Sequence, residues 1–217
     1  MCGVTCQMQK ITALHSLLVL LHLNIDLYST LLAQVDPPTE ANIKKDLRRT
    51  LPNKLEFNEP GGSGKNRLYN VLKAYAQYDP QVKYCQGLNY VAAMILLYIN
   101  KEELAFFTLV HIMYNFDWRQ VYTEEMPKLT ILIDLFISKL EMYLPKVYNH
   151  LRVLEVDISG LFSHVFLSIF IYCTPLSLAV RIFDLFMLEK ENALISVAIN
   201  MLRIMKEKIM TYNSMVM

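Results

Sequence analysis

The sequence predicts an all-α protein, a single-domain bundle of many short to medium helices. Apolar residues recur at intervals of three and four, as at Leu68, Val71, Leu72 and Tyr75, which is the spacing of one helix face. No stretch alternates convincingly between apolar and polar residues as a half-buried strand does. The 217 residues include only 6 glycines and 8 prolines, which leaves little material for long linkers.

The composition and net charge limit the kinds of partner that the protein is expected to bind. Hydrophobic residues make up 54% of the chain and charged residues 19%, so helices buried on more than one side are expected. The formal net charge is +1, which gives no electrostatic reason for binding nucleic acid or an anionic membrane. Recognition of a partner would therefore depend on a local surface.

Residues 1–27 are predicted to be a leader that is either divergent or truncated. The leucine-rich run 11–25 is interrupted by His15, His22 and Asn24. This makes the run too short and too polar to favour a signal peptide or a membrane anchor.

Residues 28–35 predict a short helix, which the prolines at 37 and 38 end. Thr39 then suits the N-cap of a helix that carries residues 43–49.

The stretch 58–64 is the one loop that composition predicts. Its glycines resemble a phosphate-binding loop, but Glu59 stands where that motif needs glycine and Asn66 where it needs serine or threonine. We expect a solvated turn here, and a nucleotide-binding enzyme is the least favoured class of function.

The rest of the chain predicts further helices that end at prolines or polar turns. Asn100 and Glu103 have the spacing of a capping box, and Thr174 suits the cap of a helix whose first turn holds Pro175. The predicted helices start at Leu68 and end near Asp79, then cover residues 91–99, 104–116, 126–144, 145–154, 162–172 and 192–210.

The run 165–180 is apolar enough to resemble a membrane span. Thr174 and Pro175 interrupt it, so two buried helices joined by a tight corner fit better than one span. A helical scaffold or a membrane-embedded protein is the alternative that this run leaves open.

The four cysteines predict neither a metal site nor a disulfide framework. Cys2, Cys6, Cys85 and Cys173 form no C-x-x-C pair, and no histidine lies at ligand spacing from the first two. Free, buried thiols in a reducing compartment are expected.

Two polar motifs stand out against the apolar helices. Residues 43–50 have the form I-x-x-D-x-x-R-T, in which Asp46 and Arg49 are three residues apart and would share a helix face. Gln86 stands beside Gly87 at the entrance of an apolar helix. Taken singly, the first motif is more often a surface ion pair and the second a hydrogen bond at a helix start.

Together, the two motifs resemble the paired signature of the TBC family, the GTPase-activating proteins for Rab GTPases. That signature is I-x-x-D-x-x-R followed by Y-x-Q, and both halves are complete here. The surrounding stretches 49–52, 72–75, 84–87 and 181–184 are also similar to the family. The resemblance covers residues 28–210 and leaves 211–217 as a tail.

The resemblance implies that Arg49 is an arginine finger and that Gln86 replaces the GTPase's own glutamine. Supporting roles would fall to Ile43 as a helix anchor, Asp46 as the group that aims Arg49, Tyr84 as the group that places Gln86, and Asn89 as a weaker candidate for fixing the loop backbone. Arg49→Ala would then abolish activation and leave the fold intact. No cofactor of its own is implied, since GTP and Mg²⁺ come with the Rab partner. The implied location is cytoplasmic and peripheral to endomembranes, with membrane contact only through the GTPase.

Three departures from the family pattern keep a second function open. Lys83 stands where the family usually has glycine, and Val165 and Phe183 stand where tryptophan is frequent. The alternative is a catalytically weak or inactive Rab-binding module.

Overall fold

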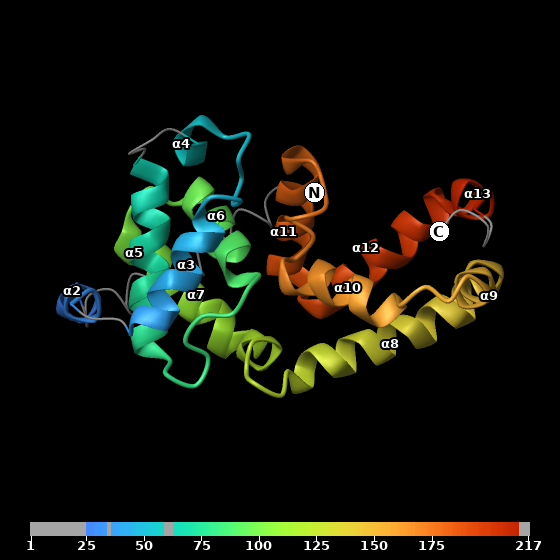
Figure 1. The fold of residues 1–217 in the computed structure, drawn as a ribbon, viewed down its shortest axis with the longest axis horizontal. Coiled ribbons are helices and arrows are strands. Elements are labelled where there is room, and N and C mark those ends of the chain that lie inside the picture. Colours follow the sequence, from blue (N-terminus) through green and yellow to red (C-terminus); the bar gives the residue numbers. More distant parts are fainter. Residues whose placement is uncertain (1–24, 34–35, 59–62, 213–217) are drawn as a thin grey trace, which may run out of the picture. The chain divides into compact units, whose positions relative to one another are not determined.

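A computed structural model of the chain describes residues 25–33, 36–58 and 63–212. The predicted leader lies outside these ranges except for residues 25–27, and most of the predicted tail lies outside them as well. All regular structure in the described ranges is helical (Figure 1), and they contain no strand, so the predicted all-α class is confirmed. The chain divides into two compact units, residues 1–119 and 120–217.

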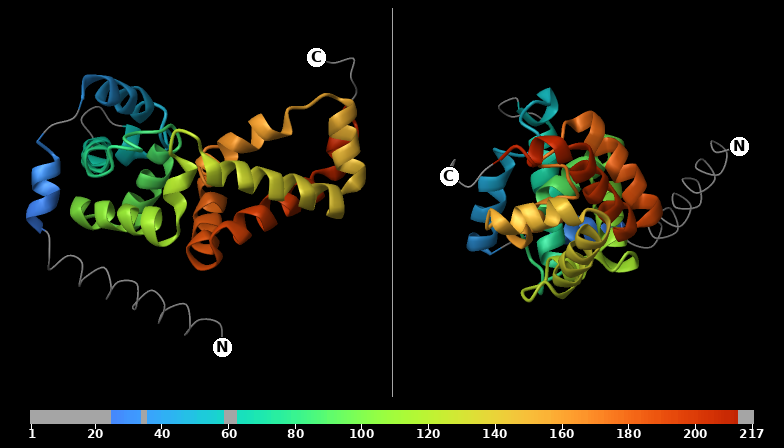
Figure 2. Two further views of the ribbon diagram at one scale, coloured as in Figure 1. Left: turned by 90° about the horizontal axis from the view of Figure 1, so that it is seen from below. Right: turned by 90° about the vertical axis from the view of Figure 1, so that its right-hand side faces the viewer.

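The first unit is built around one long helix, α5 (Ser63–Tyr78). The predicted stripe Leu68, Val71, Leu72 and Tyr75 is buried on α5. Figures 1 and 2 show the neighbouring helices of this unit around α5, which packs against five of them. These are α2 (Ile25–Leu31), α3 (Pro37–Leu47), α4 (Leu55–Asn58), α6 (Leu88–Tyr98) and α7 (Glu102–Asn115).

The start of α3 differs from the prediction by three residues. Asp36 is the N-cap, and its carboxylate accepts hydrogen bonds from the Thr39 backbone N–H at 3.0 Å and from the Thr39 hydroxyl at 2.9 Å. These hydrogen bonds hold the pKa of Asp36 below its ordinary value. Thr39 therefore lies inside the first turn, because Pro37 provides a backbone angle that suits the first helical position.

The predicted capping box is also wrong. Helix α7 begins at Glu102 with Lys101 as its N-cap, and no side chain caps it. The Asn100 carbonyl instead accepts a hydrogen bond from Arg67 Nη1 at 2.9 Å.

The range 58–64, predicted as a glycine-rich loop, is helical at both of its ends. Helix α4, which the sequence reasoning missed, ends at Asn58, and α5 begins at Ser63. Gly64 is buried against α4, where a Cβ atom would lie 2.6 Å from the Glu56 carbonyl oxygen. This glycine therefore allows two helices to approach closely and belongs to helix packing.

A short 3₁₀ helix, Trp118–Val121, includes the last residues of the first unit and the first residues of the second. The described part of the second unit, which ends at residue 212, contains six further helices. Helix α8 packs against α9, α10 and α12, and α12 packs against α11 (Figure 2). The predictions for residues 126–144 and 145–154 are confirmed within one residue at each end. The helices are α8 (Pro127–Tyr143), α9 (Pro145–Val153), α10 (Ile158–Leu167), α11 (Leu176–Glu189), α12 (Glu191–Ile204) and α13 (Lys206–Ile209).

The apolar run 165–180 is divided as predicted, but its break is longer. Helix α10 ends at Leu167, because Ile169 and Phe170 adopt left-handed backbone angles of φ 48° and 62°. Thr174 does not cap α11, since its hydroxyl donates to the Phe170 carbonyl at 2.8 Å. Of the helices in the described ranges, none combines the length and the hydropathy that crossing a bilayer requires.

Candidate functional site

The first motif lies at the end of α3. Ile43 and Asp46 are buried on this helix, which ends at Leu47. Arg49 therefore lies just beyond the helix, contrary to the prediction that residues 43–49 are all helical. A turn hydrogen bond from the Arg49 N–H to the Asp46 carbonyl, 3.1 Å long, keeps the two residues on the same side.

The Asp46 carboxylate joins the two motifs. Its Oδ1 accepts a hydrogen bond from Arg49 Nε at 2.9 Å and forms an ion pair with Arg49 Nη2 at 2.8 Å. Its Oδ2 accepts a hydrogen bond from the Tyr84 hydroxyl at 2.6 Å. The Asp46 side chain is 6% exposed and the Arg49 side chain 42%. The guanidinium is thus held along one edge, and its Nη1 edge remains available to an outside partner.

Burial, followed by the hydrogen bond to Asp46, raises the pKa of Tyr84 above its ordinary value. The phenol therefore stays protonated at neutral pH and acts as the donor in the contact with Asp46.

A second chain of hydrogen bonds runs from the same helix end to the backbone beside Gln86. The Thr50 hydroxyl donates to the Asp46 carbonyl at 2.7 Å and accepts from Asn89 Nδ2 at 2.8 Å. Asn89 Oδ1 then accepts from the Gly87 N–H at 3.1 Å. Both Thr50 and Asn89 are buried. Sequence reasoning assigned no role to Thr50, although it follows Arg49 directly in the motif.

Gln86 lies two residues before Leu88, the first residue of α6. Its side chain is exposed, and the next residue, Gly87, is the N-cap of α6 with φ 108°. An L side chain at residue 87 would be strained at this angle. The turn therefore fixes the direction in which the backbone presents Gln86.

The two described cysteines are free but not buried as predicted. Cys85 is half-buried in the loop before Gln86, and Cys173 is exposed. Burial, with a smaller effect of Asp46, raises the pKa of the Cys85 thiol to about 11. The thiol is therefore protonated at neutral pH and is a weak nucleophile. Cys2 and Cys6 lie outside the described residues.

The family model described as Rab-GTPase-TBC domain matches residues 21–210. The chain belongs to this family.

The Caenorhabditis elegans protein named Rab GTPase-activating protein tbc-11 is 34% identical over 165 residues, which cover 76% of this chain and 18% of that protein. The human protein named Ecotropic viral integration site 5 protein homolog is 32% identical over 185 residues, covering 85% of this chain and 23% of the human protein. The chain thus spans about a fifth of the length of these relatives.

A solved structure of the Chlamydomonas flagellar RabGAP TBC domain has the same fold. The TM-score is 0.75 at 24% sequence identity, and the match covers 86% of this chain and 62% of the other. The predicted TBC-like fold is therefore confirmed.

Lys83 is a strained position in this TBC domain. It lies in the loop directly before Tyr84, is exposed, and has φ 51°. This left-handed region favours glycine, the residue that resemblance to the family leads one to expect here. The backbone of the loop therefore has the shape that glycine would adopt more readily.

We expect Lys83→Gly to stabilise the first unit by about 1 kcal/mol. Glycine removes the steric cost that a Cβ atom has in the left-handed region. The greater conformational entropy of glycine in the unfolded chain offsets part of this gain. The midpoint of urea unfolding measures the change. Lys83→Ala is the matched control, since it removes the same side chain and keeps Cβ. An equal gain in both variants would show that the side chain, and not the backbone angle, is the source.

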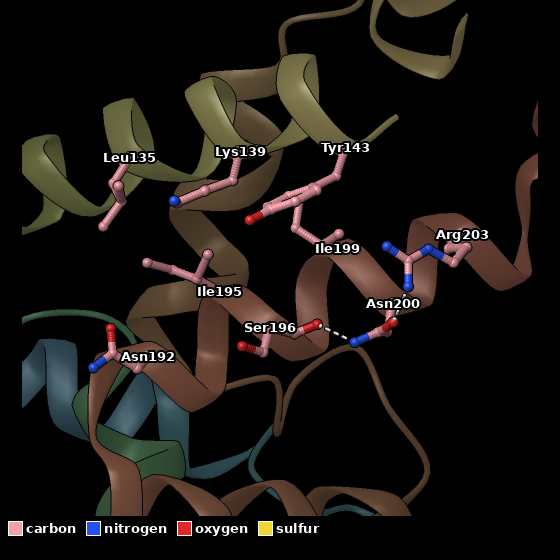
Figure 3. A pocket seen from close by; sticks show the side chains of 9 residues that line it. All are labelled: Leu135, Lys139, Tyr143, Asn192, Ile195, Ser196, Ile199, Asn200 and Arg203. Carbon is pink, nitrogen blue, oxygen red and sulfur yellow. Dashed lines mark hydrogen bonds between the residues drawn. The ribbon is translucent and has the colours of Figure 1, made fainter. Parts of the chain in front are cut away.

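The second unit of the TBC domain contains a groove that is separate from the two motifs. Figure 3 shows it between α8 and α12. Its volume is about 340 Å³. Among the described residues, no histidine or carboxylate lines it, so none of them offers Ser196 a base that would activate it as a nucleophile. Asn200 and Arg203 are hydrogen-bonded within α12, through Asn200 Nδ2 to the Ser196 carbonyl and Arg203 Nη1 to Asn200 Oδ1. The lining residues are Leu135, Lys139, Tyr143, Asn192, Ile195, Ser196, Ile199, Asn200 and Arg203.

Proposed function

We propose that this chain is a GTPase-activating protein for a Rab-family small GTPase, and that it supplies Arg49 and Gln86 to the active site of its partner. The observation that carries the proposal is the buried network that connects the two residues. Asp46 holds Arg49, and Thr50 and Asn89 link the same helix end to the backbone next to Gln86. Both functional side chains are exposed at the ends of this network.

The proposed role of Arg49 is charge stabilisation. Negative charge spreads over the phosphoryl oxygens during GTP hydrolysis, and an arginine supplied in trans accelerates the reaction by roughly 10³- to 10⁵-fold. This corresponds to about 4–7 kcal/mol of barrier. The contacts with Asp46 restrict the side chain before the GTPase arrives, so less conformational freedom is lost on binding.

The proposed role of Gln86 is to orient the attacking water. A carboxamide has a donor and an acceptor but does not titrate near neutral pH, so its contribution is positional. Gly87, held by Asn89, sets the backbone from which the amide projects. Tyr84 restrains the same loop through its hydrogen bond to Asp46, and the buried Ile43 anchors the helix that carries Asp46.

The nucleotide and the Mg²⁺ ion belong to the GTPase in this proposal. The chain's own residues supply the guanidinium, the carboxamide and the framework that presents them. Contact with a membrane would follow from the partner's location at an endomembrane surface.

Single-turnover GTP hydrolysis on a panel of Rab GTPases tests the proposed function. We expect acceleration of at least one Rab by the wild-type chain and none by Arg49→Ala at the same concentration. Absence of acceleration on every Rab that the chain binds would contradict the proposal.

A second candidate function, a Rab-binding module without catalytic activity, is favoured by Lys83. This exposed cation lies in a strained conformation directly before Tyr84, on the loop that carries Gln86. Binding of a GTP-loaded Rab without any acceleration of hydrolysis would identify this function.

A further inference from the structure

A second buried carboxylate, that of Asp79, organises the start of the loop that carries Gln86. Its side chain is 2% exposed. Asp79 Oδ1 accepts hydrogen bonds from the backbone N–H groups of Gln81 and Val82, both at 3.3 Å. The Asp79 carbonyl also accepts one from the Lys83 N–H at 2.7 Å. The first turn of the loop is therefore built on this one residue.

Arg119, the last residue of the first unit, binds the same carboxylate. Its Nε donates to Asp79 Oδ2 at 2.5 Å and its Nη2 to Asp79 Oδ1 at 2.8 Å, so the contact uses both oxygens. Nη2 also donates to Gln81 Oε1 at 2.6 Å. The hydroxyls of Tyr75 and Tyr114 donate to Oδ2 at 3.2 Å and 3.3 Å. Burial acts to raise the pKa of Asp79, but the hydrogen bonds from Arg119 and Val82 outweigh it and hold the pKa below its ordinary value.

The loop is therefore fixed at three places around Gln86. Asp79 and Arg119 fix its beginning, the Tyr84 hydroxyl is bound to Asp46, and the Gly87 N–H is bound to Asn89. Gln86 itself is exposed. A side chain that must hold a water molecule in one orientation depends on the backbone that carries it.

We propose that Arg119 is a positioning residue for Gln86, acting through Asp79 and the backbone of residues 81–83. This inference rests on the proposed function of Gln86. Without the guanidinium, a buried carboxylate is left short of its charged partner and must either take up a proton or move toward water. Either change weakens its hydrogen bonds to the Gln81 and Val82 amides, which releases one of the fixed points of the loop.

A double-mutant cycle on single-turnover GTP hydrolysis, at a concentration of the chain that saturates the Rab, tests this inference. We expect Arg119→Ala to lower the maximal rate on the order of 10- to 100-fold, with the Kd for GTP-loaded Rab within about twofold of wild type. In the Gln86→Ala background, Arg119→Ala should cause no further loss, because the group on which it acts is already gone. Independent, multiplicative losses from the two substitutions would overturn the proposal.

Two further variants separate positioning from general stability. Arg67→Ala removes another arginine of the same unit, one that is paired with Glu56 and the Asn100 carbonyl; we expect it to lower stability and leave the maximal rate unchanged. Arg119→Lys keeps a cation near Asp79 but loses the two-pronged contact, so it should fold and recover only part of the rate. Full recovery by lysine would show that charge alone, and not the fixed geometry, is needed.

Amide hydrogen exchange in the full chain tests the same inference without any GTPase. Arg119→Ala should speed exchange at residues 81–87, and Arg67→Ala should not. Unchanged exchange in Arg119→Ala would overturn the inference whatever the hydrolysis assay gives. Faster exchange in a chain that accelerates no Rab would instead uphold the positioning of the loop and contradict the proposed function.

Discussion

Arg49→Ala is expected to lower the GTPase-activated rate by about 10³-fold or more, the effect of removing an arginine finger. The substitution takes away the guanidinium that Asp46 holds and that is partly exposed to solvent. Because the exposed part of the side chain is free to contact the GTPase, we expect the loss to appear in the complex with the GTPase. Single-turnover hydrolysis on an accepted Rab measures it, and equal rates for mutant and wild type would remove the assignment.

The same substitution is expected to leave the fold in place at a cost of about 1–3 kcal/mol, because the nearly buried Asp46 carboxylate keeps only the Tyr84 hydroxyl as a side-chain partner. The structure thus adds a stability term to the sequence-based expectation of an unaffected fold. Arg49→Lys is the matched control, since it keeps a positive charge beside Asp46 and lacks the planar fork. Lysine should restore most of the stability and little of the rate.

Gln86→Ala is expected to lower the activated rate by about 10²- to 10³-fold, the usual effect of removing one preorganised polar group from a reaction centre. Its stability should stay within about 0.5 kcal/mol of wild type, because the side chain is exposed. The rate of the Arg49→Ala, Gln86→Ala double mutant should be close to that of Arg49→Ala alone, since both groups act on one transition state.

Gln77 provides the control for this second prediction. It is an exposed glutamine on α5 of the same unit, and Gln77→Ala should change neither rate nor stability. A loss of rate in Gln77→Ala equal to that in Gln86→Ala would show that the assay responds to something other than the carboxamide at residue 86.

Helical periodicity was sufficient to predict the class of the fold and most of its helices. The stripe from Leu68 to Tyr75 is buried as expected. Apolar residues at this spacing lie on one face of a helix, and that face packs against the core. The three predicted caps at Thr39, Asn100 and Thr174 were wrong. Each is a polar residue near a helix start. Whether such a residue caps the helix depends on the position at which the helix begins, and tertiary packing determines that position.

The residues of the candidate site could be named from the sequence, but their contacts with one another could not. Resemblance to the family pointed to Asp46, Arg49, Tyr84 and Gln86, and to Asn89 more weakly. The contacts of Asn89 with Thr50, 39 residues away, and of Asp79 with Arg119, 40 residues away, have no local signal in the sequence. Helix packing brings these pairs together, so only the structure could identify them.

The central claim is that Arg49 and Gln86 complete the active site of a GTPase in its transition state. The most direct test is the affinity of the chain for a Rab GTPase that carries GDP, Mg²⁺ and aluminium fluoride, which together imitate that state. We predict that wild type binds this form at least about 10²-fold more tightly than the GTP-loaded form, and that Arg49→Ala and Gln86→Ala each lose most of the gain. Equal affinity of the wild-type chain for the two forms would contradict the claim.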